Sequence, residues 1–577
     1  MVRDVLVARI MKVLLLLVLV AGCDTSNLPV SDIADTVYIG GRIYTVNDYQ
    51  PWAESIAIKD GRFISVGTDQ ESKQHIGETT KVVELAGAFV MPGLQDAHIH
   101  TQMVAEFNHN LSMDPEGSWG EISAAIKKYA VDHPDRRWVL GGNLPWLTTV
   151  IGDNDLIQAH RKVLDELAPN HAVALWDVGG HALLVNSKGL AMAGIDDDTA
   201  DPAGGTIERD ADGVATGVVR ELATSLVLES ATAMTVDEYA AELKVAISQL
   251  SSLGITSINE VWTFPTTLKA LKQLDEAKEL HMRVVASIAH PAEFVTEPAK
   301  QAARELIENR KEFTGDRLKP RYVKFVLDGS AGGQTLALID PYEGTDFRGE
   351  LRNPEDLVKS EVNRLHGEGI GSVLHAVGDR AVEIALDSVE AAIANHGRNG
   401  VRHIIAHSVF VNPKDLNRFA ELGVIAEFSP YFWWPSEGQE ILRDELGEER
   451  LSWGFPVKAI QESGAHLAAG SDWPVVFDPN AFPALEAMVT REHPGGSEDN
   501  FGKDHAITLP EALKVFTMGS AYALQQEDTT GSIEVGKYAD FIVLEKNLLE
   551  IPVREIHRTR VDSTVLEGKV IYQRNGT

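Results

Sequence analysis

Short apolar runs alternate with longer amphipathic stretches through the middle of the chain. The apolar runs have the length of buried strands, and the stretches between them, such as 236–253 and 381–395, carry apolar residues at helical spacing. This alternation is typical of βα units around a parallel sheet, and eight such units predict an α/β protein built on a (β/α)8 TIM barrel. The eight predicted strands are 88–98, 254–261, 283–290, 321–328, 371–377, 402–407, 423–429 and 466–472.

Both ends of the chain show a different pattern, in which short alternating strands are separated by turn residues. Residues 36–90 are broken at Gly40-Gly41 and at Asp60-Gly61, which we interpret as hairpin turns. The C-terminal part repeats this style. We therefore predict a small β-sandwich domain formed by residues 36–87 and 528–577. It flanks a barrel domain at 88–527.

One segment of the predicted barrel is too long for a single crossover. Residues 101–250 separate the first two strands, whereas a loop of this kind normally has a few residues before and after one helix. We interpret 101–250 as an inserted subdomain, a large insertion after strand 1 that covers the mouth of the barrel.

The first 23 residues have the pattern of an export signal. Basic residues precede the apolar stretch 13–21, which is too short to span a bilayer as a stable helix. The ending "VAGC" resembles the lipobox of bacterial lipoproteins, which implies lipidation of Cys23, with a plain secretory signal as the alternative. We expect residues 24–35 to be a polar tether. The protein would then be an exported lipoprotein of the bacterial cell envelope, membrane-anchored on the periplasmic side. Asp24 favours the inner membrane.

Composition narrows the classes of partner. The 577 residues include 85 acidic and 52 basic ones, a formal net charge of −33 that repels the phosphates of nucleic acids. A hydrophobic content of 44% is that of an ordinary globular protein. With one cysteine, the chain has no internal disulfide. We therefore expect a small-molecule substrate and no nucleic-acid partner.

Residues able to bind metal lie where the predicted barrel strands end. His98 and His100 are two residues apart and so share one face of a strand. The carboxyl ends of barrel strands carry the chemistry in this fold, and imidazole with carboxylate suits Zn²⁺ or a similar ion. Taken singly, each histidine could be a core residue and the aspartate a helix cap. The set is His98, His100, His375, His407 and Asp472, and Lys324 lies on the fourth predicted strand.

Five segments carry a resemblance to a known family. "MPGLQDAHIH", "YVKFVLDGSAGGQTLAL", "LHAVGDRAVEIAL", "IIAHS" and "LAAGSDWPV" resemble the amidohydrolase superfamily, and more narrowly its third amidohydrolase group, with the YtcJ-like proteins and N-substituted formamide deformylase. The resemblance extends over nearly everything after the tether. It implies that the four histidines and Asp472 bind one or two divalent metal ions, with zinc expected, and that CO₂ converts Lys324 to a carbamate bridging two ions. Pairing into a homodimer is a further expectation.

The resemblance also implies a hydrolytic mechanism. A bound ion lowers the pKa of water so that hydroxide forms near neutral pH. Asp472 would orient that nucleophile and carry its proton to the leaving group. His181 is a candidate for polarising the scissile carbonyl or for binding substrate, against an equally weighted structural role. Asp328 and Asp379 are expected to hold the ligands in place.

The substrate is the least determined feature. Aromatic residues near the predicted mouth, Trp146, Tyr431, Trp433 and Trp473, predict an apolar pocket for an N-substituted amide, and packing of the insert onto the barrel is the alternative. We favour a metal-dependent hydrolase acting on carbon–nitrogen bonds other than peptide bonds. Ester or lactone hydrolysis, or deamination, at the same metal site stays open, as does, less favoured, a non-catalytic binding lipoprotein.

Overall fold

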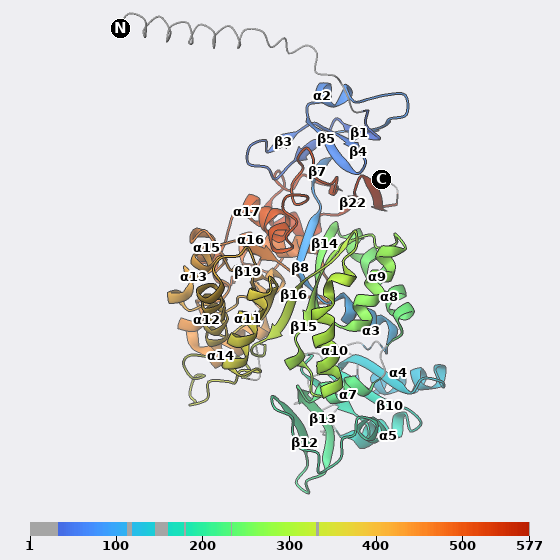
Figure 1. Cartoon of the computed structure of the whole chain (residues 1–577), viewed down its shortest axis with the longest axis vertical. Helices are drawn as coiled ribbons and strands as arrows, with labels where there is room; N and C mark the ends of the chain where they lie inside the picture. The colour runs from blue at the N-terminus through green and yellow to red at the C-terminus, as the bar shows by residue number, and fades with distance from the viewer. Residues whose placement is uncertain are drawn as a thin grey trace, which may run out of the picture.

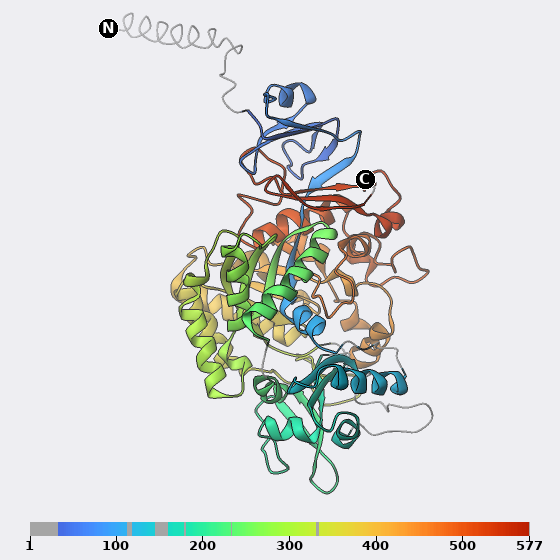
Figure 2. The same ribbon diagram turned by 90° about the vertical axis from the view of Figure 1, so that its right-hand side faces the viewer.

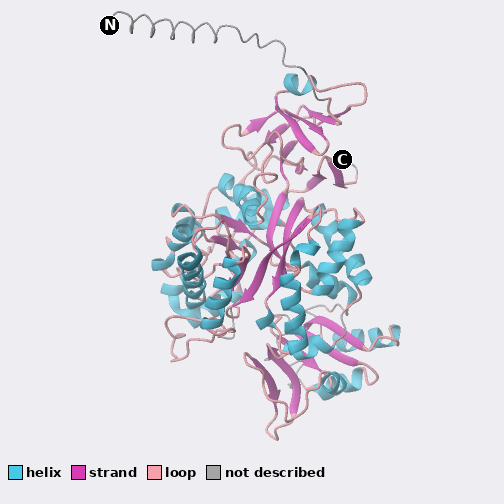
Figure 3. Cartoon of the chain, viewed as in Figure 1, coloured by secondary structure: helices cyan, strands magenta, loops and turns pink. Residues whose placement is uncertain are grey.

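The centre of the protein is one sheet of eight parallel strands surrounded by helices (Figures 1 and 3). The computed structural model describes residues 33–111, 113, 118–144, 160–177, 180–231, 234–330 and 334–575. The strands of this sheet are β8 (Leu94–Ile99), β14 (Ile255–Thr263), β15 (Arg283–Ala289), β16 (Leu318–Val326), β17 (Gly371–Ala376), β18 (Ile404–His407), β19 (Ile425–Phe428) and β20 (Leu467–Ala469).

The two edges of this sheet meet, so that it forms a barrel. The backbone N–H of Asp472, just after β20, donates to the carbonyl of His98 in β8 at 2.8 Å. The N–H of His100 donates in turn to the carbonyl of Trp473 at 2.9 Å. The (β/α)8 barrel predicted from the hydrophobic pattern is thereby confirmed.

Amphipathic helices cover the outside of the barrel because each buries one apolar face against the strands. In α8 (Val236–Ser252), Leu243, Ile247 and Leu250 are buried, and a capping box between Thr235 and Glu238 fixes where the helix begins. The other helices of this layer are α9 (Pro265–Glu276), α10 (Glu297–Glu308), α11 (Glu355–Gly367), α12 (Asp379–His396), α13 (Arg418–Leu422), α14 (Glu437–Leu451), α15 (Val457–Glu462), α16 (Ala481–Thr490), α17 (Leu509–Lys514) and α18 (Ser520–Ala523).

The segment predicted as one first strand, 88–98, is two strands. Residues of β7 (Phe89–Pro92) pair with β21 (Phe541–Leu544) in a terminal sheet, and only β8 belongs to the barrel. Gly93 separates the two, and a Cβ there would lie 2.4 Å from the side chain of Thr256. The chain therefore passes from the terminal domain into the barrel without a connecting loop.

Two sheets built from both ends of the chain stack beside the barrel, as predicted. Asp60 and Gly61 take positive φ angles and connect β4 to β5 as an antiparallel hairpin, which confirms that turn. The prediction of a hairpin at Gly40-Gly41 is wrong, because β1 and β2 lie in different sheets and the chain crosses between them there. The first sheet holds β5 (Arg62–Gly67), β4 (Ser55–Lys59), β1 (Thr36–Ile39) and β6 (Lys81–Glu84), and the second holds β23 (Lys569–Gln573), β22 (Val561–Leu566), β21, β7, β2 (Arg42–Tyr44) and β3 (Trp52–Ala53).

The insertion after the first barrel strand has its own five-stranded sheet. It lies at the opposite end of the barrel from the terminal sheets (Figures 1 and 2). The barrel strands run toward it, so the insertion faces their carboxyl ends. Its elements are α3 (Thr101–His109), α4 (Trp119–Asp132), β9 (Trp138–Leu144), α5 (Arg161–Leu167), β10 (Ala172–Asp177), β11 (Ala182–Val185), α6 (Ser187–Met192), β12 (Gly205–Arg209), β13 (Ala215–Glu221) and α7 (Thr224–Ser230).

The predicted signal peptide, with its lipidation site at Cys23, lies outside the described residues, as does the tether up to residue 32. Export and lipid anchoring therefore stay predictions from the sequence. Within the part of the chain that the structure describes, no helix has both the length and the apolar character needed to cross a membrane.

Candidate metal centre

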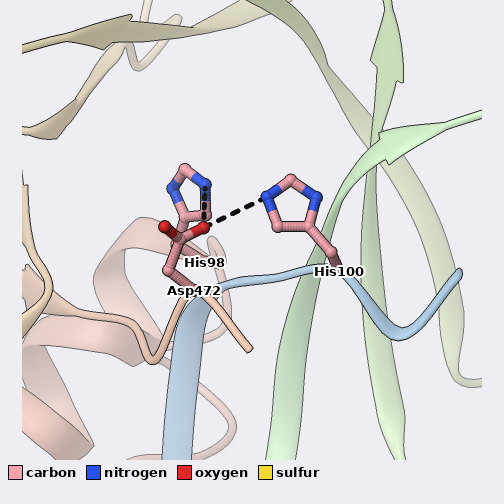
Figure 4. A group of neighbouring side chains, drawn as sticks. All are labelled: His98, His100 and Asp472. Atoms are coloured by element: carbon pink, nitrogen blue, oxygen red, sulfur yellow. Dashed lines mark ion pairs between the residues drawn. The ribbon is translucent and has the colours of Figure 1, made fainter. Parts of the chain in front are cut away.

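The carboxyl ends of the barrel strands bring the six predicted ligand residues together. Three of them meet at one carboxylate oxygen: Oδ1 of Asp472 lies 3.1 Å from Nε2 of His100 and 3.5 Å from Nε2 of His98 (Figure 4). The amine of Lys324, in β16, lies 3.3 Å from the same nitrogen of His98. Two ring nitrogens from β8 thus converge on Asp472, and the amine from β16 contacts one of them.

The two histidines of β17 and β18 complete the cluster. The ring of His407 lies 4.6 Å from that of His98 and 4.7 Å from that of His375, measured between centroids. Nε2 of His375 donates to the carbonyl of Gly329 at 3.1 Å, which leaves its Nδ1 as the nitrogen available to an ion. The six residues form one continuous cluster at the barrel mouth.

Burial sets the charge of this cluster. It lowers the pKa of His98 and His407 well below the ordinary value for histidine, and it lowers the pKa of His375 to about 3, with the nearby charge of Lys324 as the second cause. The three imidazoles are therefore neutral at neutral pH. A neutral imidazole keeps a lone pair that can bind a cation.

A carboxylate that the sequence analysis missed lies beneath the cluster. Oε2 of Glu427, in β19, accepts hydrogen bonds from Nδ1 of His98 and from the backbone N–H of His407, both at 3.1 Å. This contact leaves Nε2 of His98 as the nitrogen that faces Asp472 and Lys324. Burial raises the pKa of Glu427 to about 8, so its ionised form is costly unless a cation lies nearby. A lone glutamate within the apolar run "GVIAEFS" was the signal available in the sequence.

We predict that Glu427→Gln weakens metal binding about 10- to 100-fold, because the amide has no negative charge to anchor Nδ1 of His98. Ion retained after dialysis against graded chelator would measure the effect. Glu421→Gln, an exposed position on α13, is the matched control. If Glu427→Gln binds the metal as tightly as the unmodified protein does, the carboxylate of Glu427 does not support metal binding.

His181 reaches the same mouth from the insertion. Its Nδ1 lies 3.0 Å from Oε1 of Glu221, and its Nε2 lies 3.0 Å from Oγ of Ser330. Ser330 follows Gly329, whose carbonyl accepts the hydrogen bond of His375. The predicted proximity of His181 to the metal residues is thus present, and both of its ring nitrogens have partners.

The two aspartates expected to hold ligands in place differ in their contacts. Asp328 accepts backbone hydrogen bonds from Val377 and Gly378, two and three residues after His375, and burial raises its pKa to about 7. It therefore fixes the segment that carries His375. Asp379 begins α12 and accepts the backbone N–H of Ile339, a contact that lies away from the ligands.

The aromatic residues predicted to bind substrate are mostly buried. Trp433 is 0% exposed, with the guanidinium of Arg491 over its ring at 4.4 Å, and the hydroxyl of Tyr431 donates to the carbonyl of Pro479. Trp473 is 5% exposed. The ring and hydrogen-bond partners of Trp433 and Tyr431 belong to the barrel domain and not to the insertion. Substrate binding by these rings stays a prediction. Trp146 lies outside the described residues.

The donor set fits a divalent cation. Among the described residues, two groups of three side chains each bring their ligand atoms within 4.8 Å of one another. One group is His98, His100 and Asp472, and the other is His98, His407 and Glu427. Nδ1 of His100 and Oε1 of Glu427 are buried and form no hydrogen bond with the described residues. Nitrogen and carboxylate donors at this spacing suit an ion of the class to which zinc belongs.

Known proteins with similar sequences and structures include metal-dependent hydrolases. The amidohydrolase family model matches residues 81–572. YtcJ of Bacillus subtilis is 25% identical over 93% of this chain and 99% of its own length, and N-substituted formamide deformylase of Arthrobacter pascens is 25% identical over 95% and 100%. A solved structure of an uncharacterized metal-dependent hydrolase from Pyrococcus furiosus is 26% identical, with a TM-score of 0.69 over 89% of this chain and 100% of the other. The resemblance stated from five motifs is confirmed, and the chain belongs to the amidohydrolase family of metal-dependent hydrolases.

Proposed function

We propose that the protein hydrolyses a carbon–nitrogen bond in a small amide or N-substituted formamide. The observation that carries this proposal is the convergence of two imidazoles, those of His98 and His100, on one carboxylate oxygen of Asp472 at the carboxyl ends of the barrel strands. Similarity to N-substituted formamide deformylase over nearly the whole chain supports the choice of bond.

The metal would be held by His98, His100, His375, His407 and Asp472, and zinc is the expected ion because its usual ligands are imidazole and carboxylate. One or two such ions supply Lewis acidity and acidify water. The protein's own groups then position and move protons. Glu427 holds the tautomer of His98, and Asp472 takes a proton at its carboxylate and delivers it to the departing nitrogen. The role of His181 in polarising the carbonyl or binding substrate stays a prediction, and the proton steps above do not use it.

Lys324 is proposed to act as a carbamate. Burial lowers its pKa to about 8, which increases the fraction of neutral amine, the form that attacks CO₂. A bond forms between Nζ and the carbon of CO₂, and the nitrogen loses a proton. The product is an anion in place of a cation, with oxygens that can serve as metal ligands.

A hydrolysis panel tests the proposed function. The full-length, metal-loaded protein is assayed on N-formyl and N-acyl amines, on the matching esters and lactones, and on amino-heterocycles. We expect kcat/KM for the best amide to exceed that of its matched ester at least about 10-fold after correction for the uncatalysed rates. Turnover of esters or lactones without amide cleavage would assign the metal centre to ester hydrolysis. Release of ammonia from the heterocycles without amide cleavage would assign it to deamination.

A further inference from the structure

A serine, a histidine and a glutamate meet at the barrel mouth outside the metal ligand set. Ser330 lies after β16, His181 directly precedes β11, and Glu221 ends β13. Oγ of Ser330 is 3.0 Å from Nε2 of His181, and Nδ1 of His181 is 3.0 Å from Oε1 and 3.2 Å from Oε2 of Glu221. The barrel thus supplies the hydroxyl, and the insertion supplies the imidazole and the carboxylate.

The carboxylate determines what the imidazole can do. When the imidazole is neutral and its Nδ1–H donates to Glu221, Nε2 has a lone pair that faces the hydroxyl of Ser330. A hydroxyl within hydrogen-bond reach of a base, with the base oriented by a carboxylate, is the arrangement that activates a serine nucleophile. This arrangement is recognised by geometry and not by the order of residues along the chain.

The surroundings keep Glu221 charged. Burial alone raises the pKa of this carboxyl, but the hydrogen bond from His181 and the positive charge of Arg352 hold the pKa below its ordinary value. Nη1 of Arg352 lies 3.7 Å from Oε2 of Glu221. Glu221 also has a φ of +49°, a strained backbone conformation of the kind found at functional sites.

Other histidine–carboxylate pairs of the described chain differ from this one at the second ring nitrogen. Two other histidines outside the metal centre pair with a carboxylate, His290 with Glu361 and His557 with Glu486. The second nitrogen of His290 accepts a backbone N–H, and that of His557 accepts from Arg558, so neither faces a hydroxyl. The side chain of His181 is 33% exposed, which leaves it open to a ligand.

We propose that Ser330, His181 and Glu221 form a nucleophilic site for carboxylic esters that works independently of the metal centre. Oγ of Ser330 bonds to the ester carbonyl carbon while its proton passes to Nε2 of His181. The bond from that carbon to the alcohol oxygen breaks, and His181 gives the proton to the departing alkoxide. Water then cleaves the acyl-serine by the same proton route and restores the hydroxyl. The site goes beyond the proposed amide hydrolysis, because it shares none of the metal ligands.

An alkyl fluorophosphonate tests this site directly, since an activated serine displaces fluoride and keeps the phosphorus. We expect one label per chain of the metal-loaded protein, on the peptide that contains Ser330. Ser330→Ala should abolish that label, and His181→Gln should slow labelling at least about 100-fold. Ser187→Ala is the matched control, because this serine lies in the insertion that carries His181 and bonds to Asp165 with no histidine partner. The Ser187→Ala variant should be labelled at the same rate as the unmodified protein.

A second measurement covers the case in which His181→Gln does not fold. p-Nitrophenyl acetate should give a burst of nitrophenol and an acetyl group on Ser330, and Ser330→Ala should remove both. Asp472→Asn separates the two sites, since it should lose amide hydrolysis and still label at Ser330. The proposal would be overturned if Ser330 carries no label or if only other residues are labelled. It would also be overturned if folded His181→Gln is labelled at the rate of the unmodified protein.

Discussion

Asp472→Asn is expected to lower kcat for amide hydrolysis by about 10³- to 10⁴-fold while the protein stays folded and retains most of its metal. The amide oxygen of asparagine keeps the position of the carboxylate oxygen beside Nε2 of His98 and of His100 and can still serve as a metal ligand, so the cluster keeps its shape. What the amide lacks is the ability to take up a proton and release it to the departing nitrogen. The loss should therefore fall on kcat, with a smaller effect on bound ion.

The control for this variant is Asp478→Asn, an exposed aspartate six residues further along the chain. Metal content by mass spectrometry and circular dichroism are recorded for both variants, and rates are compared at saturating metal. A metal-loaded Asp472→Asn protein that keeps its activity would refute the assignment of Asp472 as the proton carrier.

The barrel was predictable because its signal is periodic and local. Each βα unit repeats an apolar run and an amphipathic helix, and the buried faces of elements such as β14 and α8 follow that pattern residue by residue. The division of 88–98 was not predictable from hydrophobicity, since β7 and β8 are both apolar and pair with different sheets. Gly93 was the sign of that division, because its lack of a side chain permits the close approach to Thr256.

The candidate site was predictable only in part, for a reason of distance along the chain. His98 and His100 share a strand face, so their spacing in the sequence is also their relation in space. Glu427 bonds to His98 from a strand 329 residues further along, and no local pattern reveals such a contact. Glu221 and Ser330 were missed for the same reason, because their meeting with His181 depends on how the insertion folds over the barrel.

Lys324→Ala should lower kcat/KM by about 10³-fold or more, and millimolar acetate or propionate should restore part of it. In the unmodified protein the neutral amine would accept CO₂, and the resulting carbamate would supply ligand oxygens that alanine cannot. A small carboxylate has the same pair of oxygens and fits the space left by the lysine side chain. Lys319→Ala, on the same strand and directed to the carbonyl of Gly315, is the matched control and should keep full activity.

The competing explanation for Lys324 is a plain ammonium group paired with the carboxylates around it. Burial disfavours that charge, which is why its pKa lies near 8, while Asp472 and Glu427 oppose the shift. The two explanations differ in their outcomes. A carbamate predicts a new carbonyl carbon signal after incubation with ¹³C-bicarbonate, loss of that signal in Lys324→Ala, and an inactive Lys324→Arg. An ammonium ion predicts no such signal, no recovery with acetate, and an active Lys324→Arg, because arginine preserves the positive charge.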